Sequence, residues 1–427
     1  MQNSLDRKLA AIHADPSGSK EFILADAKDA DMALGIGAPG RSPEMHAGEL
    51  RFRSLEEYRQ QMRQIVEQGL VDIMLMSAST NEVLTHGERL FDHSAVTPAA
   101  RANDTSDIFI VRGGRYTAEP SRPFRTATID HIQCGRAECE RGERVAGTNL
   151  GLYSITFNNR LDEDLAALEA YRRFRLEAEA KGFRHFLEVF DPNAPASLAR
   201  DDVPGFVNDS IARTLAGVTQ AGRPLFLKVV YHGPRAMEEL VAYDAHLIVG
   251  ILGGSAGTTY DAFKLIAEAQ KYGARVALFG RKINHAECQL AFVKFLRLIV
   301  EGQISPEEAV RAYHGVLERL GIRPHRSLAE DMQLQSNVMS YGGTSSVAVP
   351  RPISSKRDSQ LSTVRAGVDS RPNSVADAAG STSECACRCK HDEGNMSSAV
   401  PDFAAMSQAE KLAYNQAKRD RIFGKLS

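Results

Sequence analysis

The sequence has no tryptophan, no large excess of charge of either sign and no long apolar run. Its 52 basic and 54 acidic residues leave a formal net charge of -2, which argues against bulk binding to nucleic acid or to an acidic membrane surface. No apolar stretch approaches the roughly 18–20 residues that span a bilayer. Residues 1–19 lack an apolar signal core, so no secretory signal is expected.

Cysteine is also scarce, with six residues in 427, too few for a disulfide framework. Cys134, Cys139 and Cys288 lie in the body of the chain, and the other three form CACRC at 385–389, just before His391. That spacing is tighter than the Cys-x₂₋₄-Cys pairs of structural zinc sites, so no metal site is predicted. Reduced thiols and a cytoplasmic location fit this cysteine usage best.

The composition changes near residue 340. Residues 341–400 are rich in Ser, Gly, Pro and Arg and poor in large apolar side chains, which predicts a disordered linker. Residues 401–427 then predict a short C-terminal helix, with Ser407 and Glu410 at capping-box spacing. Two interpretations stay open: a frayed tail helix, or a docking peptide for a protein partner.

Upstream of the linker, short apolar runs alternate with amphipathic stretches. The expected strands are Phe22–Ala27, Asp72–Ser77, Asp107–Arg112, Gly151–Asn158, Arg184–Phe190, Pro224–Tyr231, His246–Leu252 and Arg275–Phe279. Between two of them, Leu161, Leu165, Leu168 and Tyr171 recur at helical spacing. Eight strand–helix units in about 280 residues predict an α/β fold, a (β/α)₈ TIM barrel. A doubly wound open sheet is the alternative.

The expected domain layout follows from this rhythm. Residues 1–20 form an N-terminal extension, and residues 21–330 form the barrel. Residues 113–150 interrupt the repeat with a basic, polar segment, interpreted as an insertion at the catalytic rim that contains a further strand in FRTATIDHIQ. Barrels of this kind often form multimers, so a homo-oligomer is expected.

The run RPLFLKVVYHG places a lysine in an apolar strand. Period-two alternation puts Phe226, Lys228, Val230 and His232 on one face. Burying a charged lysine is costly, and desolvation favours the neutral amine that imine formation needs. A snorkelling lysine or a structural ion pair is the alternative.

Two further strand ends carry anion-binding patterns. HLIVGILGGSAGTT runs from an apolar strand through small residues into a helix, so backbone N–H groups can approach an anion closely. ARVALFGRKIN ends at Gly280, with Arg281 and Lys282 at the tip. Together these turns match the phosphate site after strands seven and eight of many barrels.

At these separations KVVYHG, GGSAG and GRKIN resemble the last three strands of the archaeal-type class I fructose-bisphosphate aldolase family. The similarity covers about residues 205–285 and is weaker over 65–80, which holds VDIMLMSAS. The resemblance implies that Lys228 forms the Schiff base. It also implies a substrate phosphate held by Gly253, Gly254, Ser255, Gly280 and Arg281.

Two departures from the family concern the proton-transfer partner. The family places a tyrosine on strand five just before a proline, whereas here HFLEVFDPNAP has Phe190, which cannot transfer a proton. Glu188, two residues earlier on the same face, either replaces the tyrosine as acid and base or only pairs with Lys228 as an ion. The counterpart of the family's first-strand aspartate is Asp26, although the motif around it is absent.

Other candidates are weaker. GIGAPG at 35–40 has a proline where a helix should begin, which argues against a dinucleotide site. Asp130 and His131 lie together in the insertion and could reach the rim, although a surface strand is the favoured interpretation. His232 either shuttles protons or is a structural histidine.

The sequence therefore predicts a class I aldolase or related lyase that acts on a small phosphorylated, sugar-like carbonyl compound without metal or organic cofactor. Lys228, Glu188, Asp26 and His232 are the expected catalytic residues. Two alternatives stay open: an imine-independent acid–base isomerase or epimerase on the same barrel, and a catalytically inactive scaffold whose tail recruits a partner.

Overall fold

The computed structural model describes residues 3–41, 52–254 and 257–335, with Ser407, Ala409, Glu410, Ala413 and Tyr414. The chain divides into two units, one formed by Met1–Pro43 and Leu50–Pro350 and the other by Glu44–Glu49 and Arg351–Ser427. The first unit contains the barrel. None of the described helices has the length and the apolar character that crossing a membrane requires.

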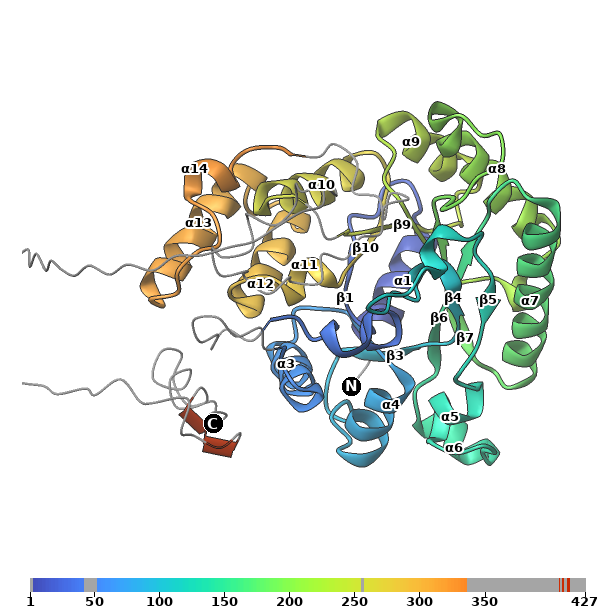
Figure 1. The fold of residues 1–427 in the computed structure, drawn as a ribbon, viewed down its shortest axis with the longest axis horizontal. Coiled ribbons are helices and arrows are strands. Elements are labelled where there is room, and N and C mark those ends of the chain that lie inside the picture. The colour runs from blue at the N-terminus through green and yellow to red at the C-terminus, as the bar shows by residue number, and fades with distance from the viewer. Residues whose placement is uncertain are drawn as a thin grey trace, which may run out of the picture. The chain divides into compact units, whose positions relative to one another are not determined.

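Eight parallel strands close into a barrel in the order β1-β10-β9-β8-β7-β6-β3-β2, as the sequence predicts (Figure 1). They are β1 (Ile23–Lys28), β2 (Ile73–Met76), β3 (Thr97–Arg101), β6 (Leu150–Thr156), β7 (Arg184–Phe190), β8 (Leu227–Val229), β9 (Val249–Leu252) and β10 (Val276–Phe279). A separate antiparallel pair joins β4 (Asp104–Thr105) to β5 (Pro123–Phe124).

The third predicted strand is wrong. Asp107–Arg112 contains the end of a 3₁₀ turn (Ser106–Ile108) and a loop, whereas the barrel strand at this place is Thr97–Arg101. It pairs with β2 and β6, and all its residues except Pro98 are buried. The apolar side chains of 108–111 instead belong to a segment that crosses the carboxyl end of the barrel, where Ile108 is buried.

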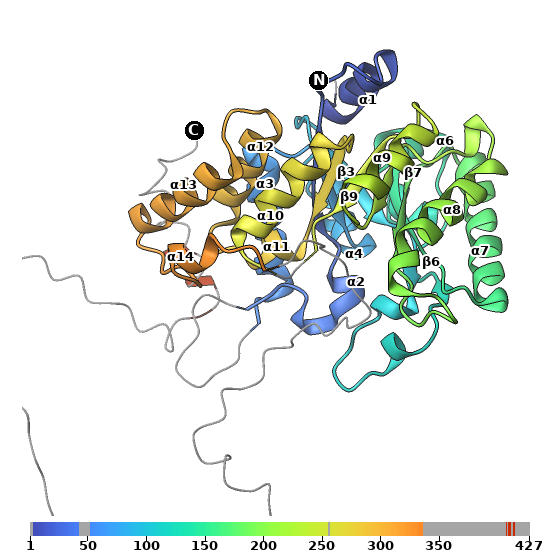
Figure 2. The same cartoon turned by 90° about the horizontal axis from the view of Figure 1, so that it is seen from above.

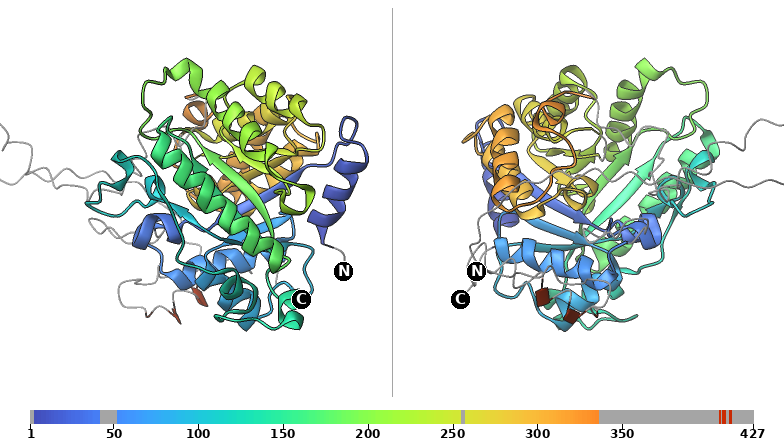
Figure 3. Two further views of the ribbon diagram at one scale, coloured as in Figure 1. Left: turned by 90° about the vertical axis from the view of Figure 1, so that its right-hand side faces the viewer. Right: turned by 60° about the vertical axis from the view of Figure 1, so that its left-hand side comes forward.

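Helices surround the strands (Figures 1 and 3). They are α1 (Ser4–Ala14), α2 (Asp31–Leu34), α3 (Leu55–Gln68), α4 (Ala78–Asn81), α5 (Ile129–Cys134), α6 (Arg141–Ala146), α7 (Leu161–Ala180), α8 (Val203–Ala216), α9 (Pro234–Tyr243), α10 (Thr259–Lys271), α11 (Arg281–Asn284), α12 (Gln289–Val300), α13 (Pro306–Arg319) and α14 (Leu328–Asp331). Short 3₁₀ or π turns are Gly35–Gly37, Glu82–Gly87, Ser106–Ile108, Tyr116–Ala118, Arg200–Asp202 and Gln220–Gly222.

Local sequence explains where several helices begin. Ser54 and Glu57 form a reciprocal capping box at the start of α3, and Thr258 and Asp261 form one at the start of α10. The predicted apolar face of the 161–180 helix is partly wrong. Leu161 is 74% exposed, because the buried face of α7 is built from smaller and aromatic residues further along the helix.

The barrel strands bury two layers of side chains. One layer fills the interior with residues from alternate strand positions, among them Ala25, Ala27, Phe186 and Phe226. The other, with Leu24, faces the helices. Because successive side chains on a strand point to opposite faces, this division decides which polar residues reach the interior.

Helix α1, the core of the predicted N-terminal extension, covers the amino end of the barrel (Figure 2). Leu5, Leu9 and Ile12 pack into the interior layer. Lys8 Nζ donates to Asp72 Oδ2, 2.8 Å away, just before β2. With this end covered, the interior can be reached from the carboxyl ends of the strands, where barrel active sites lie.

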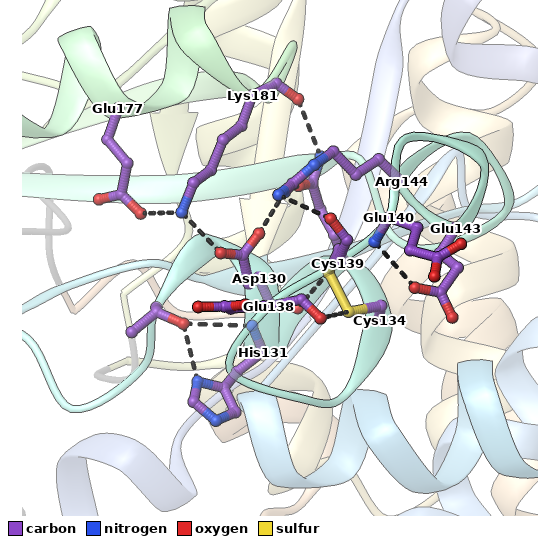
Figure 4. Close-up of polar contacts among 12 residues, drawn as sticks. Asp130, His131, Cys134, Glu138, Cys139, Glu140, Glu143, Arg144, Glu177 and Lys181 are labelled. Carbon is purple, nitrogen blue, oxygen red and sulfur yellow. Dashed lines mark hydrogen bonds and ion pairs between the residues drawn. A yellow bond between two sulfur atoms is a disulfide. The ribbon is translucent and has the colours of Figure 1, made fainter.

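The segment between β3 and β6 is divided between the two ends. Its first part lies at the carboxyl rim, because Asn193, which follows β7, donates to the carbonyls of Thr117 and Glu119. Its second part lies at the amino end, because Asp130 pairs with Lys181, just before β7, at 2.8 Å (Figure 4). The predicted position of residues 113–150 at the rim therefore agrees with the structure only for the first part of this segment.

Two expectations for the second part are corrected. The strand predicted in FRTATIDHIQ is helix α5 from Ile129 onward, since the Thr128 hydroxyl accepts the backbone N–H of His131 and caps it. Cys134 and Cys139 form a disulfide instead of the free thiols expected (Figure 4). It joins the end of α5 to the residues before α6. Asp130 and His131 thus lie far from the rim.

In the second unit, the reciprocal contact predicted for the tail is present. The backbone N–H of Ser407 donates to Glu410 Oε2, and the N–H of Glu410 donates to Ser407 Oγ. Ala409, Glu410, Ala413 and Tyr414 are helical. The predicted linker 341–400 and the CACRC segment lie outside the described residues.

Candidate active site

Lys228 and Glu188 point into the barrel from neighbouring strands. They are register partners in β8 and β7, and the Lys228 amine lies 2.5 Å from Glu188 Oε1. The Lys228 side chain is 4% exposed and the Glu188 side chain is fully buried. Phe226, two residues before Lys228, belongs to the interior layer, as the predicted alternation requires. The strand pattern therefore brings a buried amine and a buried carboxylate into direct contact.

Arg101, at the end of β3, lies on the other side of Glu188. Its guanidinium is 3.7 Å from Glu188 Oε2. Ser154 Oγ, on β6, donates to the same Glu188 oxygen over 2.8 Å and accepts from Arg101 over 3.2 Å. Glu188 is thus held between two cations and one hydroxyl, which fixes the orientation of its carboxylate.

Asp29 completes this inner charge network. Its Oδ2 accepts from Arg101 Nε at 2.6 Å, and the residue is 5% exposed. Burial alone would lower the pKa of Arg101, but Asp29, Glu188 and Asp104 together raise it. Burial raises the pKa of Asp104 to about 6, against the opposing effect of Arg101. Arg101 is therefore a permanent cation that balances the inner carboxylates.

These charges lie at a pocket at the carboxyl end of the barrel. Its lining residues are Ala27, Asp29, Ala30, Ala33, Leu34, Arg101, Ile108, Ile110, Lys228, Leu252, Gly253, Gly254, Leu278, Gly280 and Arg281. The two predicted anion-binding turns thus reach the same pocket as Lys228. Ser255 lies outside the described residues.

Glycine is required at two positions of these turns. A Cβ on Gly253 would lie 2.2 Å from the Phe279 ring, and one on Gly280 would lie 2.4 Å from the carbonyl oxygen of Ala27. Lys282, which is 9% exposed, donates over 2.8 Å to the carbonyl of Gly257 and ties the turn after β9 to α11. Both turns are therefore packed closely against the strand ends.

Asp26 does not belong to this pocket. It lies on the outer face of β1 with Leu24, whereas Ala25 and Ala27 face the interior. By the same alternation Asp29, not Asp26, enters the pocket. The assignment of Asp26 as a catalytic residue is corrected for this reason.

Asp26 instead forms a second buried pair with Lys28, 3.4 Å away and, like Asp26, fully buried. Lys28 donates to the side chains of Asn284 and Gln289, and its amine lies 5.8 Å from the centre of the Tyr58 ring. Burial raises the pKa of Asp26 to about 6 and lowers the pKa of Lys28 to about 8. This pair links β1 to the helices outside it.

His232 is also apart from the network. Its Nε2 lies 2.8 Å from Asp191 Oδ1, beyond the end of β8, and it does not line the pocket. The described contacts therefore fit the structural interpretation of this histidine better than a proton shuttle to Lys228.

An apolar cluster borders the pocket. Ile108, Phe190, Val230 and Leu252 pack together, and each is at most 4% exposed. Phe190 thus serves as packing where the resembling family has a tyrosine. No group of three or more His, Cys, Asp or Glu side chains in the described part of the chain could hold a metal ion. The absence of a cofactor stays a prediction.

Sequence reasoning missed Arg101, Asp29 and Ser154. Arg101 was missed because β3 was placed ten residues too late along the chain. Asp29 carried a usable signal, since it follows Ala25 and Ala27 at the period of two that defines the inner face. Ser154 carried the same signal after Leu150 and Leu152.

No protein-family model matches the sequence, and no curated protein matches it. Among solved structures, the chain is similar to an archaeal fructose 1,6-bisphosphate aldolase, with 12% identity over 69% of this chain and 99% of that chain and a TM-score of 0.49. It is also similar to orotidine 5'-phosphate decarboxylase from Pyrococcus horikoshii OT3, with 12% identity over 66% of this chain and 100% of that chain and a TM-score of 0.36. A putative dihydrodipicolinate synthetase from Pseudomonas aeruginosa has 12% identity over 70% of this chain and 83% of that chain, with a TM-score of 0.37.

Proposed function

We propose that this protein is a class I, Schiff-base-forming aldolase or a related lyase, and that it acts on a phosphorylated, sugar-like carbonyl compound. One observation carries the proposal: the Lys228 amine lies 2.5 Å from Glu188 Oε1, at a pocket that both glycine turns also line. A carbonyl carbon bound there would meet a nucleophile and its proton acceptor together.

The first step of the proposed reaction is proton transfer. Lys228 passes one ammonium proton to Glu188 and becomes a neutral amine. The amine nitrogen attacks the substrate carbonyl to form a carbinolamine. Glu188 then returns the proton to the carbinolamine oxygen, which leaves as water, and an iminium ion remains on Lys228.

Cleavage uses the same two groups. Glu188 takes the proton of the hydroxyl on the carbon β to the iminium. The C–C bond breaks, its electron pair moves toward the iminium nitrogen to give an enamine, and an aldehyde departs. Protonation of the enamine and hydrolysis of the resulting imine release the second product. Arg101 stays charged throughout, which stabilises Glu188 each time it is ionised.

Phosphate binding is assigned to Arg281 and to the backbone N–H groups near Gly254 and Gly280. These small residues allow an anion to approach the backbone closely, and α11 begins directly after Gly280. Arg281 supplies the positive charge at the pocket. The substrate phosphate would thus be anchored on the β9 and β10 side, with its carbonyl toward β8.

The ion pair also favours an imine-independent alternative. A protonated lysine and an ionised glutamate in contact are an acid and a base, which could move a proton between adjacent carbons of a hydroxycarbonyl compound. Such an isomerase would need no covalent adduct. The packing role of Phe190 motivates the third option, an inactive scaffold.

Borohydride trapping separates these options. The protein is incubated with a panel of phosphorylated aldehydes and ketones, reduced, digested and analysed by peptide mass spectrometry. An aldolase gives a substrate-dependent secondary amine on the Lys228 peptide. Turnover without any adduct supports the isomerase, and neither turnover nor adduct supports the scaffold.

A further inference from the structure

The described residues of the pocket lining include few side chains that could recognise additional hydroxyls. Among the described lining residues, the side chains that can hydrogen-bond are Asp29, Arg101, Lys228 and Arg281, and all four are ionisable. The remaining lining residues are alanine, leucine, isoleucine and glycine. No serine, threonine, asparagine, glutamine or tyrosine side chain is among the described residues of the lining.

Ion pairs already engage charged side chains of this lining. Arg101 donates to Asp29, and Lys228 is paired with Glu188. In the proposed reaction Lys228 and Glu188 serve the carbonyl and the hydroxyl at the cleaved bond, and Arg281 serves the phosphate. Among the described lining residues, few partners remain for additional hydroxyls along a carbon chain.

The pocket wall beside these groups is apolar. Ile108 is 4% exposed and packs with Phe190, Val230 and Leu252. Ile110 is partly buried, and its backbone N–H donates to the carbonyl of Ala33 across the mouth. A hydroxyl against this wall would lose its water and gain no partner, which costs roughly 10-fold or more in affinity for each such group.

On the basis of the proposed function, we infer that the substrate is hydroxyl-poor. It is a phosphorylated aldehyde or ketone whose carbon chain carries no free hydroxyl except the one that C–C cleavage requires. Deoxy and alkyl carbonyl phosphates fit this wall, and polyhydroxylated sugar phosphates do not. Ile108 and Ile110 are the specificity-determining residues.

The test compares two ketones that differ by one hydroxyl, dihydroxyacetone phosphate and hydroxyacetone phosphate. Borohydride trapping on Lys228 is measured against concentration for each. We expect half-maximal trapping of hydroxyacetone phosphate at an at least about 10-fold lower concentration. Equal trapping, or a preference for dihydroxyacetone phosphate, overturns the inference while leaving the imine intact.

A variant tests the wall itself. Ile110→Thr replaces the ethyl branch of the side chain with a hydroxyl and also makes the side chain smaller. It should reduce the ratio of the two half-maximal trapping concentrations at least about threefold. Val111→Thr makes a similar change at a neighbouring side chain that is 38% exposed and outside the lining, and should leave the ratio unchanged. An unchanged ratio in Ile110→Thr contradicts the assigned wall. If no carbonyl phosphate gives an adduct, the proposed function fails as well.

Discussion

Two lysine–carboxylate pairs are buried on the strands of this barrel, and they differ in the face they occupy. Lys228 and Glu188 lie on the inner faces of β8 and β7, at the pocket. Lys28 and Asp26 lie on the outer face of β1, against the surrounding helices. Both pairs are nearly or fully buried. Burial and charge are common to both lysines, so they do not by themselves indicate which of the two could react with a substrate.

The two pairs differ in the number of other groups that hydrogen-bond to the lysine amine. Lys28 donates to two side-chain amides, Asn284 and Gln289, so its amine is held from several sides. For Lys228 the described contacts give one partner, Glu188, and the pocket lies beside it. An amine with one partner and open space can accept a carbonyl carbon, whereas an amine enclosed by amides cannot.

The largest expected effect comes from removing the inner lysine. Lys228→Met should abolish the borohydride adduct and lower kcat by at least about 10⁴-fold, because no other described amine lines the pocket. The matched control is the double variant Asp26→Asn/Lys28→Met, which removes the outer pair without leaving an unpaired buried charge. It should keep kcat within about threefold of the wild-type value if the outer pair is structural. A loss of the adduct in the double variant would contradict the assignment of the outer pair to a structural role.

The carboxylates give the next effect. Glu188→Gln keeps the shape but cannot accept the lysine proton, so kcat should fall by about 10²–10⁴-fold. The Asp26→Asn/Lys28→Met variant, which removes the outer carboxylate without leaving Lys28 unpaired, should leave kcat nearly unchanged. Steady-state kinetics with the trapped substrate measures both. Equal losses in the two variants would contradict the assignment of Glu188 as the proton acceptor.

How far the sequence alone leads can be judged from β1 and β3. Lys228 was identifiable because a lysine interrupts a strand of large apolar residues. The choice between Asp26 and Asp29 needed the inner face of β1, and both faces of that strand are buried, so no polar–apolar alternation marks the inside. If one interior residue of β1 were known, the alternation of side chains would assign every other residue of the strand to the inner or the outer face.

The error in β3 has a different cause. Its sequence TPAAR contains a proline and two alanines, and Thr97 is its only β-branched or aromatic residue, so it has little of the composition that usually marks a strand. The segment DIFIVR has that composition, yet it crosses the mouth of the barrel and packs through Ile108. Tertiary packing overrode local propensity in both segments. Because the strand Thr97–Arg101 was not predicted, Arg101 was not identified as a site residue.

A smaller effect is expected from Arg101, which contacts Glu188 both directly and through Ser154. It is assigned as a positioning residue. Arg101→Met should lower kcat by about 10–100-fold. It should also move the acidic limb of the kcat–pH profile to higher pH, because an ionised Glu188 loses a neighbouring cation. Arg101→Lys should restore part of the activity and move that limb back. A lowered kcat with an unchanged pH profile would indicate a purely structural role.

The smallest effect concerns the stability of the outer pair. Since burial raises the pKa of Asp26 to about 6, the folded protein binds this proton more tightly than the unfolded chain does. The stabilisation is complete below about pH 4, and it is lost as the pH rises through about 6. The Asp26→Asn/Lys28→Met variant lacks this group, and Lys28, with a pKa of about 8, does not titrate in that range. The free energy of unfolding, measured with urea at pH 4 to 6.5, should therefore fall with pH by about 1–3 kcal/mol more in the wild type than in the double variant. Parallel curves would mean that Asp26 is ionised throughout this range, which would contradict the raised pKa.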